Sequence, residues 1–498
     1  MSVENGENIS EPQNGVATSF LEMLGFKRKN RKTSAKTNKK EEESIKNEQK
    51  LPILEILSSF ITLFLSVSTI HGFAHVTAEK RHPVEILIWL SLVGAGIYGA
   101  CILSSATWTR YQENPTVVSM ERDRFAWNTS FPAATICPSF KVNDELLNNF
   151  LAKTEVKNKT ALRHFLISLA GAGYKTFDQV IPYFEIPSEQ FMGILLQLQF
   201  DFTPSVSNSG IHGYKYFLEK TITEMGICYT FNSNLAVYNS PSYWEGNSWY
   251  LLPENRTFYV HPLDGEVFAN VVNMSTGFDI YLHGPFEVVD VASKGVYSPN
   301  GHFLQVYLSG LTIFTTDSAH ALAPSQRKCR FHDESDLRHS PVYSYVLCRM
   351  ECRASLAKRL CGCIPHFYRH LDGEKVCDVN GMHCLSKYKE TLITMKNKCS
   401  CYPNCNDVNY VIEDLDTREW FLGSNLQWGL KEYPRMRLRR DVIFGFTDVL
   451  VYVGGMAGLF LGCSVLSFIE ILYFFTIRLF WYVTKYGKNT REIYNAVQ

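Results

Sequence analysis

The sequence lacks the short motifs by which many enzymes bind phosphate, hold a catalytic metal or present a nucleophile. It contains no glycine-rich phosphate loop, no H-E-x-x-H and no G-x-S-x-G, which are the spacings those chemistries need. His366 and His370 are four residues apart, but Pro365 beside them favours a loop over a metal-binding helix. We therefore expect no enzyme, no metal site and no bound cofactor.

Net charge is also absent, because 49 Lys and Arg residues balance 49 Asp and Glu residues among 498. Without a basic excess we expect no nucleic-acid partner. The balance is uneven locally, since residues 27–40 contain eight Lys or Arg and no acid. They belong to a tail, residues 1–50, that we expect to be disordered and cytoplasmic. This basic stretch either attracts anionic inner-leaflet lipid or only marks the cytoplasmic side of the membrane.

Charged residues are missing from residues 86–108, an apolar run long enough to cross about 30 Å of hydrocarbon as a helix. A second apolar run covers residues 449–475. We expect a first transmembrane helix at 83–108 and a second at 442–480. The sequence therefore predicts a multi-pass protein of the lipid bilayer.

The first fifty residues have no apolar h-region, so we expect no cleavable signal peptide. Basic residues flank both spans on the same side, which predicts that both termini, including a tail at 481–498, are cytoplasmic. Residues 51–82 are apolar but interrupted by Pro52 and Glu55, so we expect an interfacial or re-entrant cytoplasmic segment. Residues 109–441 would then form an extracellular domain.

Cysteines and glycosylation sequons agree with that orientation. Twelve of the 14 cysteines fall within residues 109–441, and an even number outside the membrane suits disulfides in an oxidising compartment. Four N-x-S/T acceptors also lie there: Asn128, Asn158, Asn255 and Asn273. Alternating runs at 277–288 and 303–315 predict strands, and residues 342–359 predict a helix, so the domain is expected to be mixed α+β.

The cysteine spacing predicts a ladder between a helix and a strand. Cys348 and Cys352 are four residues apart, on one helix face, and Cys399 and Cys401 are two apart, on one side of an extended strand. Zinc is the competing interpretation of the C-x-C pairs. The extracellular setting favours disulfides.

The second apolar run has a composition that a plain anchor does not need. Gly454, Gly458 and Gly462 form one helical stripe, and Ser464 follows. Such a stripe indicates close helix packing, a wet lumen or both, and a helix-dimerising stripe is the alternative. Glu470 costs several kcal/mol against lipid unless it faces protein or water, which marks it as functional unless it snorkels to the interface.

Seven segments in order resemble the degenerin/epithelial sodium channel family, and most closely its arthropod pickpocket branch. They are STIHG at 68–72, FPAATIC at 131–137, GICYTFN at 226–232, ECR at 351–353, LCGCIP at 360–365, CSCYPNC at 399–405 and GMAGLFLGCS at 455–464. The resemblance implies a trimeric, amiloride-sensitive plasma-membrane channel that prefers sodium, assembled from identical or related subunits. It implies two transmembrane helices flanking a large disulfide-rich extracellular domain through which a ligand, protons or force gates the pore.

On matching positions, the resemblance makes Gly462, Cys463 and Ser464 the selectivity filter, His71 and Gly72 a cytosolic gating motif, and Glu470 an acid below the filter. A small residue before a helix break lets main-chain carbonyls face a permeant sodium ion. The resemblance also implies six disulfides: Cys137–Cys228, Cys329–Cys405, Cys348–Cys401, Cys352–Cys399, Cys361–Cys384 and Cys363–Cys377.

The chain departs from the family pattern at three places. Cys463 is bulkier than the Ala or Ser usual between the filter Gly and Ser, which bears on sodium selectivity. Arg327 replaces an aromatic that contacts the top of the first span in some relatives, so coupling to the pore is expected to run differently. Tyr452 replaces an outer-mouth acid, leaving Asp448 one turn earlier as the nearest cation attractor.

Two other classes share the two-span topology. ATP-gated channels have a cysteine-rich exterior but need clustered basic residues for phosphate. Class B scavenger receptors are glycosylated lipid-binding proteins that need neither the small-residue stripe nor Glu470. The channel interpretation accounts for more of the sequence than either alternative.

Overall fold

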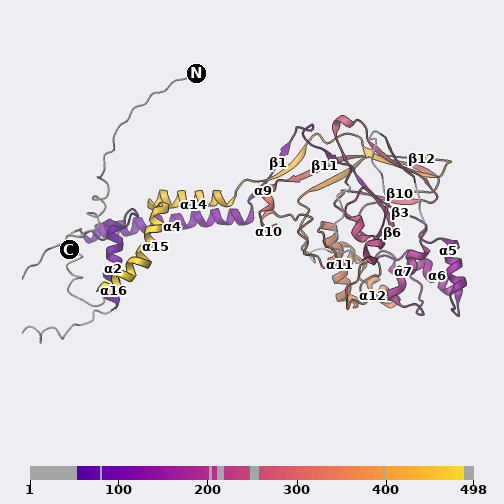
Figure 1. The fold of residues 1–498 in the computed structure, drawn as a ribbon, viewed down its shortest axis with the longest axis horizontal. Helices are drawn as coiled ribbons and strands as arrows, with labels where there is room; N and C mark the ends of the chain where they lie inside the picture. The colour runs from indigo at the N-terminus through magenta and orange to yellow at the C-terminus, as the bar shows by residue number, and fades with distance from the viewer. Residues whose placement is uncertain are drawn as a thin grey trace, which may run out of the picture. The chain divides into compact units, whose positions relative to one another are not determined.

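The computed structural model describes residues 53–78, 81–200, 205–209, 218–246, 257–395 and 399–486. The basic stretch at 27–40 and Asn255 therefore lie outside the described residues. The chain divides into two compact units. We call residues 1–97 with 457–498 the membrane unit and residues 98–456 the cysteine-rich unit (Figure 1).

Helices make up the membrane unit and continue into the other unit through α4 and α14. The elements are α2 (Ile53–Val67), α3 (Phe73–Val76), α4 (Pro83–Glu113), α14 (Phe446–Leu461), α15 (Val465–Tyr473), the π-helical η5 (Phe474–Arg478) and α16 (Leu479–Tyr486). Among described residues, two helices are long and apolar enough to cross a membrane, 83–113 and 465–482. The first extends past the predicted end at residue 108. The second predicted span, 442–480, is divided between α14 and α15.

Helix α2 is too short to span a bilayer, since 15 residues rise only about 22 Å against about 30 Å of hydrocarbon. It packs instead on the C-terminal helices. The rings of Phe60 and Phe64 lie 6.4 and 5.4 Å from that of Phe474, and all three side chains are buried. The last turns of the chain are thus held by aromatic packing against its first described helix.

Three sheets form the β part of the cysteine-rich unit. The seven-stranded sheet contains β1 (Thr116–Glu121), β4 (Ser205–Ser209), β8 (Phe268–Met274), β11 (His302–Thr315), β12 (Asp407–Glu419), β13 (Ser424–Leu430) and β14 (Arg437–Val442). The five-stranded sheet contains β3 (Ala133–Pro138), β5 (Leu218–Thr223), β6 (Gly226–Phe231), β9 (Phe278–His283) and β10 (Val296–Ser298), and β2 (Thr129–Ser130) pairs with β7 (Tyr259–Val260). The strands predicted at 277–288 and 303–315 are β9 and β11.

The sheet orders show which segments lie together. The first sheet runs β1-β14-β11-β13-β8-β4, with β12 on β11, and the second runs β10-β9-β3-β6-β5. Strand β11 is parallel to β13 and β14 and antiparallel to β12, so it is the central strand of the larger sheet. Alternate β11 residues Leu304, Val306 and Leu308 are buried, as the two-residue period of a strand predicts.

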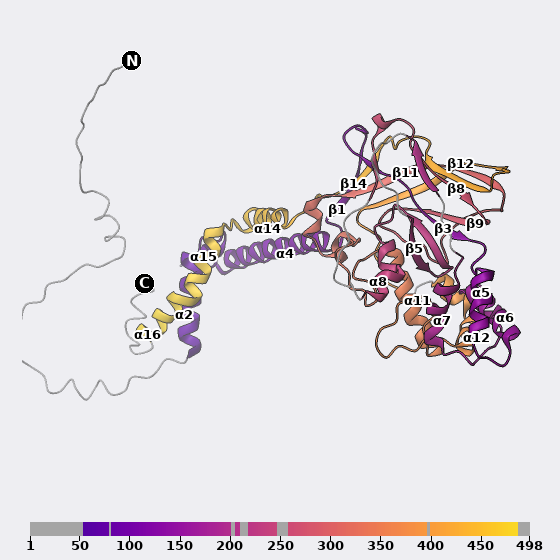
Figure 2. The same cartoon turned by 45° about the vertical axis from the view of Figure 1, so that its right-hand side comes forward.

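Short helices surround these sheets. They are α5 (Asp144–Lys153), α6 (Lys159–Ala170), η1 (Phe177–Gln179), η2 (Ser188–Gln190), α7 (Phe191–Leu198), η3 (Ala236–Asn239), α8 (Pro241–Glu245), η4 (Pro262–Asp264), α9 (Asp317–His320), α10 (Pro324–Arg327), α11 (Tyr345–Cys361), α12 (Val379–Ser386) and α13 (Lys389–Thr394). Both ribbon views place α5, α6, α7, α11 and α12 on one side of the strands (Figure 2). The helix predicted at 342–359 is α11, which starts after Ser344, whose side chain caps Leu347 N, and ends at Gly362 with φ of 72°.

Among the described residues of this unit there are two large hydrophobic clusters and a small one of Cys329, Phe331 and Cys405. The first large cluster lies among the helices, and the second joins the two larger sheets. In the second, Trp428 of β13 is fully buried, its ring lies 5.3 Å from Phe231 of β6, and its indole N–H donates to Pro132 O at 3.1 Å. The sheets therefore pack face to face around one aromatic side chain whose polar atom is satisfied.

Six disulfides link the unit: Cys137–Cys228, Cys329–Cys405, Cys348–Cys401, Cys352–Cys399, Cys361–Cys384 and Cys363–Cys377. This is the pairing that the family resemblance implies. The strand predicted at Cys399 and Cys401 is wrong, because residues 399–403 adopt no regular structure and β12 begins only at Asp407. Two cysteines need only an extended chain, without a partner strand, to reach one helix face.

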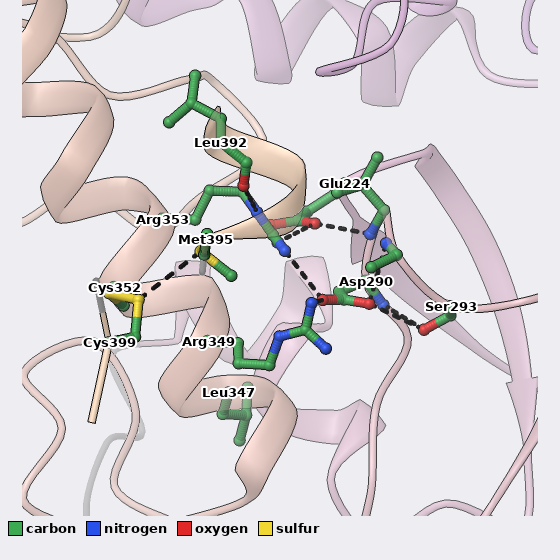
Figure 3. A network of polar contacts seen from close by, with 12 residues as sticks. Glu224, Asp290, Ser293, Leu347, Arg349, Cys352, Arg353, Leu392, Met395 and Cys399 are labelled. Carbon is green, nitrogen blue, oxygen red and sulfur yellow. Dashed lines mark hydrogen bonds and ion pairs between the residues drawn. A yellow bond between two sulfur atoms is a disulfide. The ribbon is translucent and has the colours of Figure 1, made fainter. Parts of the chain in front are cut away.

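Arg353 of α11 lies at the centre of a buried ionic network (Figure 3). Its side chain is fully buried, and one guanidinium nitrogen lies 2.5 Å from each carboxylate oxygen of Glu224, at the β5–β6 turn. A second nitrogen reaches Asp290 at 3.0 Å, and the third donates to Leu392 O at 2.9 Å. Helix α11 is thereby joined to the five-stranded sheet, to the loop after β9 and to α13.

We expect Arg353→Met to destabilise the protein by about 3–5 kcal/mol, because it leaves the buried carboxylate of Glu224 without its cation and Asp290 with Arg349 alone. Thermal unfolding of the purified full-length protein measures the loss. Arg349→Met is the matched control, since Arg349 meets the same Asp290 at 3.4 Å and is partly exposed, so its loss should stay below about 1 kcal/mol. Equal losses in the two variants would contradict a central role for Arg353.

Stability should also fall with rising pH because of Glu287, in the loop after β9. Desolvation raises the pKa of this carboxyl to about 8, although Asn404 donates to it at 2.5 Å and lowers the pKa in part. A carboxyl with a raised pKa stabilises the fold below its ordinary value near 4.5, and that contribution is lost as pH rises through about 8.

We therefore expect a melting temperature roughly 5 °C lower at pH 9 than at pH 6. Glu287→Gln, which keeps the shape without the charge, should flatten that dependence. Glu266→Gln, at an exposed position, should leave the dependence unchanged. Identical pH profiles for wild type and Glu287→Gln would show that another group is responsible.

Candidate functional site at the break between α14 and α15

The second span is interrupted at the predicted tripeptide. Helix α14 ends at Leu461, and Gly462 follows with φ of 65°, a left-handed conformation that favours glycine. Its N–H still bonds Gly458 O at 2.9 Å, while Cys463 N reaches back to Ala457 O at 3.2 Å. Helix α15 then restarts after Ser464, whose hydroxyl accepts from Ser467 N at 3.3 Å.

This break frees main-chain oxygens. The carbonyls of Gly462 and Cys463 accept no hydrogen bond from any described residue. Carbonyl oxygen is a ligand that hard cations accept in place of water. The tripeptide at the α14–α15 break thus offers two unpaired acceptors at a depth where unpaired acceptors are costly.

The loop before α3 lies directly against the break. His71 N donates to Leu461 O at 3.0 Å, and a Cβ atom added to Gly462 would overlap the His71 ring. Gly72 has φ of 92°, and a Cβ there would meet Val93 of α4. The structure therefore brings His71 of the predicted gating pair into contact with Gly462 of the predicted filter, whereas Gly72 lies against α4.

Glu470 is held by the same loop. Thr69 Oγ1 lies 2.7 Å from Glu470 Oε2 and 3.0 Å from Ser467 Oγ. The carboxylate thus contacts protein, which is the condition for keeping an acid in a span. Thr69 and Ser467 were not among the predicted site residues. Ser467 follows the capping residue Ser464 by three positions, a helix-start spacing readable from sequence, whereas nothing near Thr69 signals its partner.

The residues predicted at the outer end of the span have structural partners in the cysteine-rich unit. Asp448 Oδ2 accepts from Gly445 N at 2.8 Å at the start of α14. The Tyr452 ring lies 5.4 Å from Phe444, over which the Arg110 guanidinium sits at 5.3 Å. Around Gly454, no described atom lies within 4 Å of an added Cβ. Cation attraction by Asp448 or Tyr452 stays a prediction.

Arg327, which stands where relatives carry an aromatic, is turned inward. Its side chain is buried and pairs with Glu334. Its neighbour Gln326 makes the contact to the first span instead, with Nε2 at 3.5 Å from Tyr111 O and 3.4 Å from Gln112 Oε1. These distances allow weak hydrogen bonds. The contact with α4 at this point is therefore made by an amide side chain, which the sequence alone did not predict.

Three predicted glycan acceptors, Asn128, Asn158 and Asn273, are exposed on the cysteine-rich unit. Asn158 also caps α6 by accepting from Ala161 N at 3.0 Å.

Among described residues, no cluster of His, Cys, Asp or Glu is arranged to hold a metal. His370 Nε2 lies 3.1 Å from Ile364 O within a loop.

Two membrane-crossing helices that flank a disulfide-rich domain, the second preceded by a glycine break, define a two-span ion channel subunit. The chain belongs to the amiloride-sensitive sodium channel family, whose model matches residues 64–474. This membership makes it a channel protein and not an enzyme. Channels of this family are plasma-membrane proteins that form oligomers of related subunits.

Relatives match along most of the chain. Pickpocket protein 28 of Drosophila melanogaster is 23% identical, over 88% of this chain and 82% of that protein. Sodium channel protein Nach of the same fly is 22% identical over 84% and 86%, and the bile acid-sensitive ion channel of Mus musculus is 24% identical over 84% and 88%. A solved proton-activated chloride channel covers 78% of this chain and 96% of its own, at 6% identity and a TM-score of 0.25, too low for an argument.

We expect Gly462→Ala to abolish current, because a Cβ there overlaps the His71 ring and the backbone has positive φ. Adding His71→Ala should restore part of the current by removing the overlap, although the backbone strain of about 1 kcal/mol remains. Whole-cell current normalised to surface protein measures both. Gly455→Ala, at a position with open space around it, should conduct normally. Full current in Gly462→Ala would disprove the contact.

Proposed function

We propose that this chain is a subunit of a trimeric, sodium-preferring, amiloride-sensitive cation channel gated through its cysteine-rich unit, with both termini in the cytoplasm. The observation that carries the proposal is the break at Gly462, Cys463 and Ser464, where two carbonyl oxygens lack partners among described residues. The names of three relatives, two sodium channel proteins and a bile acid-sensitive ion channel, support conduction and gating by an outside stimulus.

An assembly is required because two spans cannot enclose a conduit. With several copies around one axis, the breaks would meet and present a ring of carbonyl oxygens to the ion. Such a ring replaces part of the hydration shell of a monovalent cation. The open space around Gly454, on the glycine stripe, leaves room for a second helix to approach α14 closely.

The loop that carries Thr69, His71 and Gly72 would support the filter from its cytoplasmic side. It is fixed to the break by the His71–Leu461 hydrogen bond and to α15 by the Thr69–Glu470 hydrogen bond. Movement of α15 would therefore carry the loop and Glu470 together. The position of α15, the proposed pore-lining helix, would thus depend on the loop that precedes α3.

The test is Ser464→Trp, recorded in cells with external sodium replaced by potassium. Wild type should pass a cation current whose reversal potential shifts with sodium and which amiloride blocks. Ser464→Trp should reduce the current at least tenfold or shift its reversal potential, with normal surface biotinylation, because Trp fills the lumen at the filter.

Leu466→Trp is the matched control, since two residues further along α15 is roughly 200° around the helix. Leu466 and Ser464 are both exposed in the single chain, so an effect of bulk alone would appear in both variants. Unchanged conductance and reversal potential in Ser464→Trp would reject the filter assignment. A single-chain or dimeric mass for the purified protein in nanodiscs would reject the trimer.

A further inference from the structure

A cavity of about 380 Å³ lies inside the cysteine-rich unit, away from the break in the second span. It is lined by the end of β11, the start of β12, the loop at Gly284 to Phe286, and the residues that follow Cys329. This volume is within the range of small-molecule sites, roughly 300–1,000 Å³. The channel mechanism proposed above uses none of these residues.

Aromatic side chains and two arginines dominate the lining. Arg437 of β14 sits over Trp127 at 4.6 Å and over Phe314 at 4.9 Å. Arg330 sits over Tyr343 at 4.9 Å. Because guanidinium groups already cover these three rings, the cavity is a poor aromatic cage for a cationic ligand.

Both arginines keep hydrogen-bonding capacity after their ion pairs are formed. Arg330 pairs with Asp336 through one Nη, and its buried Nε has no hydrogen-bond partner among described residues. Arg437 gives its Nε to Glu121 at 2.6 Å, and its Nη atoms make no hydrogen bond within the described chain. The buried hydroxyl of Thr312, at the end of β11, also lacks a partner in the described ranges.

Asp407 is the single acid among the described lining residues, against Arg330 and Arg437, whose partner acids Asp336 and Glu121 are not part of the lining. The Nη atoms of Arg437, which lack an acceptor among described residues, can pair with a carboxylate or sulfonate, and such charge-assisted hydrogen bonds are about twice as strong as neutral ones. The apolar rings would hold the remainder of such a ligand.

We propose that this cavity binds a small organic monoanion, a carboxylate or sulfonate on an apolar ring skeleton, with its charged group at Arg330 and Arg437. The site is distinct from the ion pathway. A ligand in the cavity would contact β14, because Arg437 belongs to this strand, and β14 precedes α14 in the chain.

The probe is 2-naphthoate, with 2-naphthalenemethanol as the uncharged analogue of the same shape, titrated calorimetrically into the full-length protein in lipid nanodiscs. We expect saturable binding of naphthoate at one site per chain, and affinity for the alcohol lower by about tenfold or more. Arg330→Gln and Arg437→Gln should each weaken naphthoate binding by about tenfold.

Arg418→Gln is the matched control, since Arg418 also stacks on a ring, Phe303, and pairs with an acid, Asp416, outside the cavity. Its affinity for naphthoate should stay within about twofold of wild type. Thr312→Val is a second control, because it removes an unpaired buried hydroxyl at the cavity wall without changing volume. It should melt no lower than wild type and keep its affinity for naphthoate within about twofold.

Three results would overturn the proposal. One is the absence of saturable naphthoate binding up to millimolar concentration, which is also the result expected if another copy of the chain fills the cavity. Another is equal affinity for naphthoate and the alcohol. The last is wild-type affinity in both Arg330→Gln and Arg437→Gln. None of these depends on whether the chain conducts sodium.

Discussion

A helix interrupted inside a membrane must find partners for the backbone groups that the interruption frees, and this constraint shapes the whole membrane unit. Lipid offers no hydrogen bonds, so irregular backbone persists there only against protein or water. At the break after Leu461, the freed groups are divided. Leu461 O accepts from His71 N, whereas the oxygens of Gly462 and Cys463 accept no hydrogen bond from described residues. The loop before α3 thus satisfies one of the freed groups and leaves two carbonyl oxygens unpaired within the described ranges.

In the cysteine-rich unit, the corresponding constraint is the fixed position of α11 relative to its neighbours. Four of the six disulfides attach to α11 or to the residues just after it. These bonds limit how far α11 can move, but they do not fix its rotation about its own axis. Arg353 fixes that rotation, because a fully buried guanidinium with carboxylates on two other segments has few acceptable orientations.

Much of this arrangement could be predicted from the sequence. Apolar runs indicated both spans, strand alternation indicated β9 and β11, and the family resemblance implied the break at Gly462. Contacts between distant segments could not be predicted, because periodicity reports which face of an element is buried and not what covers it. Arg353 illustrates the limit, since a charged residue in a helix ordinarily indicates a solvated face.

The misplaced strand at Cys399 and Cys401 has a related cause. A two-residue spacing reports that side chains point the same way, and any extended chain provides that without a hydrogen-bonded neighbour. At position 327 the sequence showed only that Arg327 stands where the resemblance implies an aromatic. The contact with α4 comes from the preceding residue, Gln326, whose amide reaches Tyr111 and Gln112. The contact with α4 is thus made by Gln326, one residue before the position at which the family resemblance places it.

Strands β1 and β14 explain how one unit can act on both spans. Strand β1 follows α4, β14 precedes α14, and the two pair antiparallel from Thr116 with Val442 to Glu121 with Arg437. Glu121 bridges Arg437 at 2.6 Å and Arg439 at 3.0 Å, so the ladder carries its own ionic clamp. Glu121 accepts from the Nε of Arg437, so a ligand at the Nη atoms would bind the same guanidinium from another side. Binding in the cavity would thus change the clamp that joins the strands leading to both helices, which is the differential interaction that a ligand needs in order to favour one state of a channel.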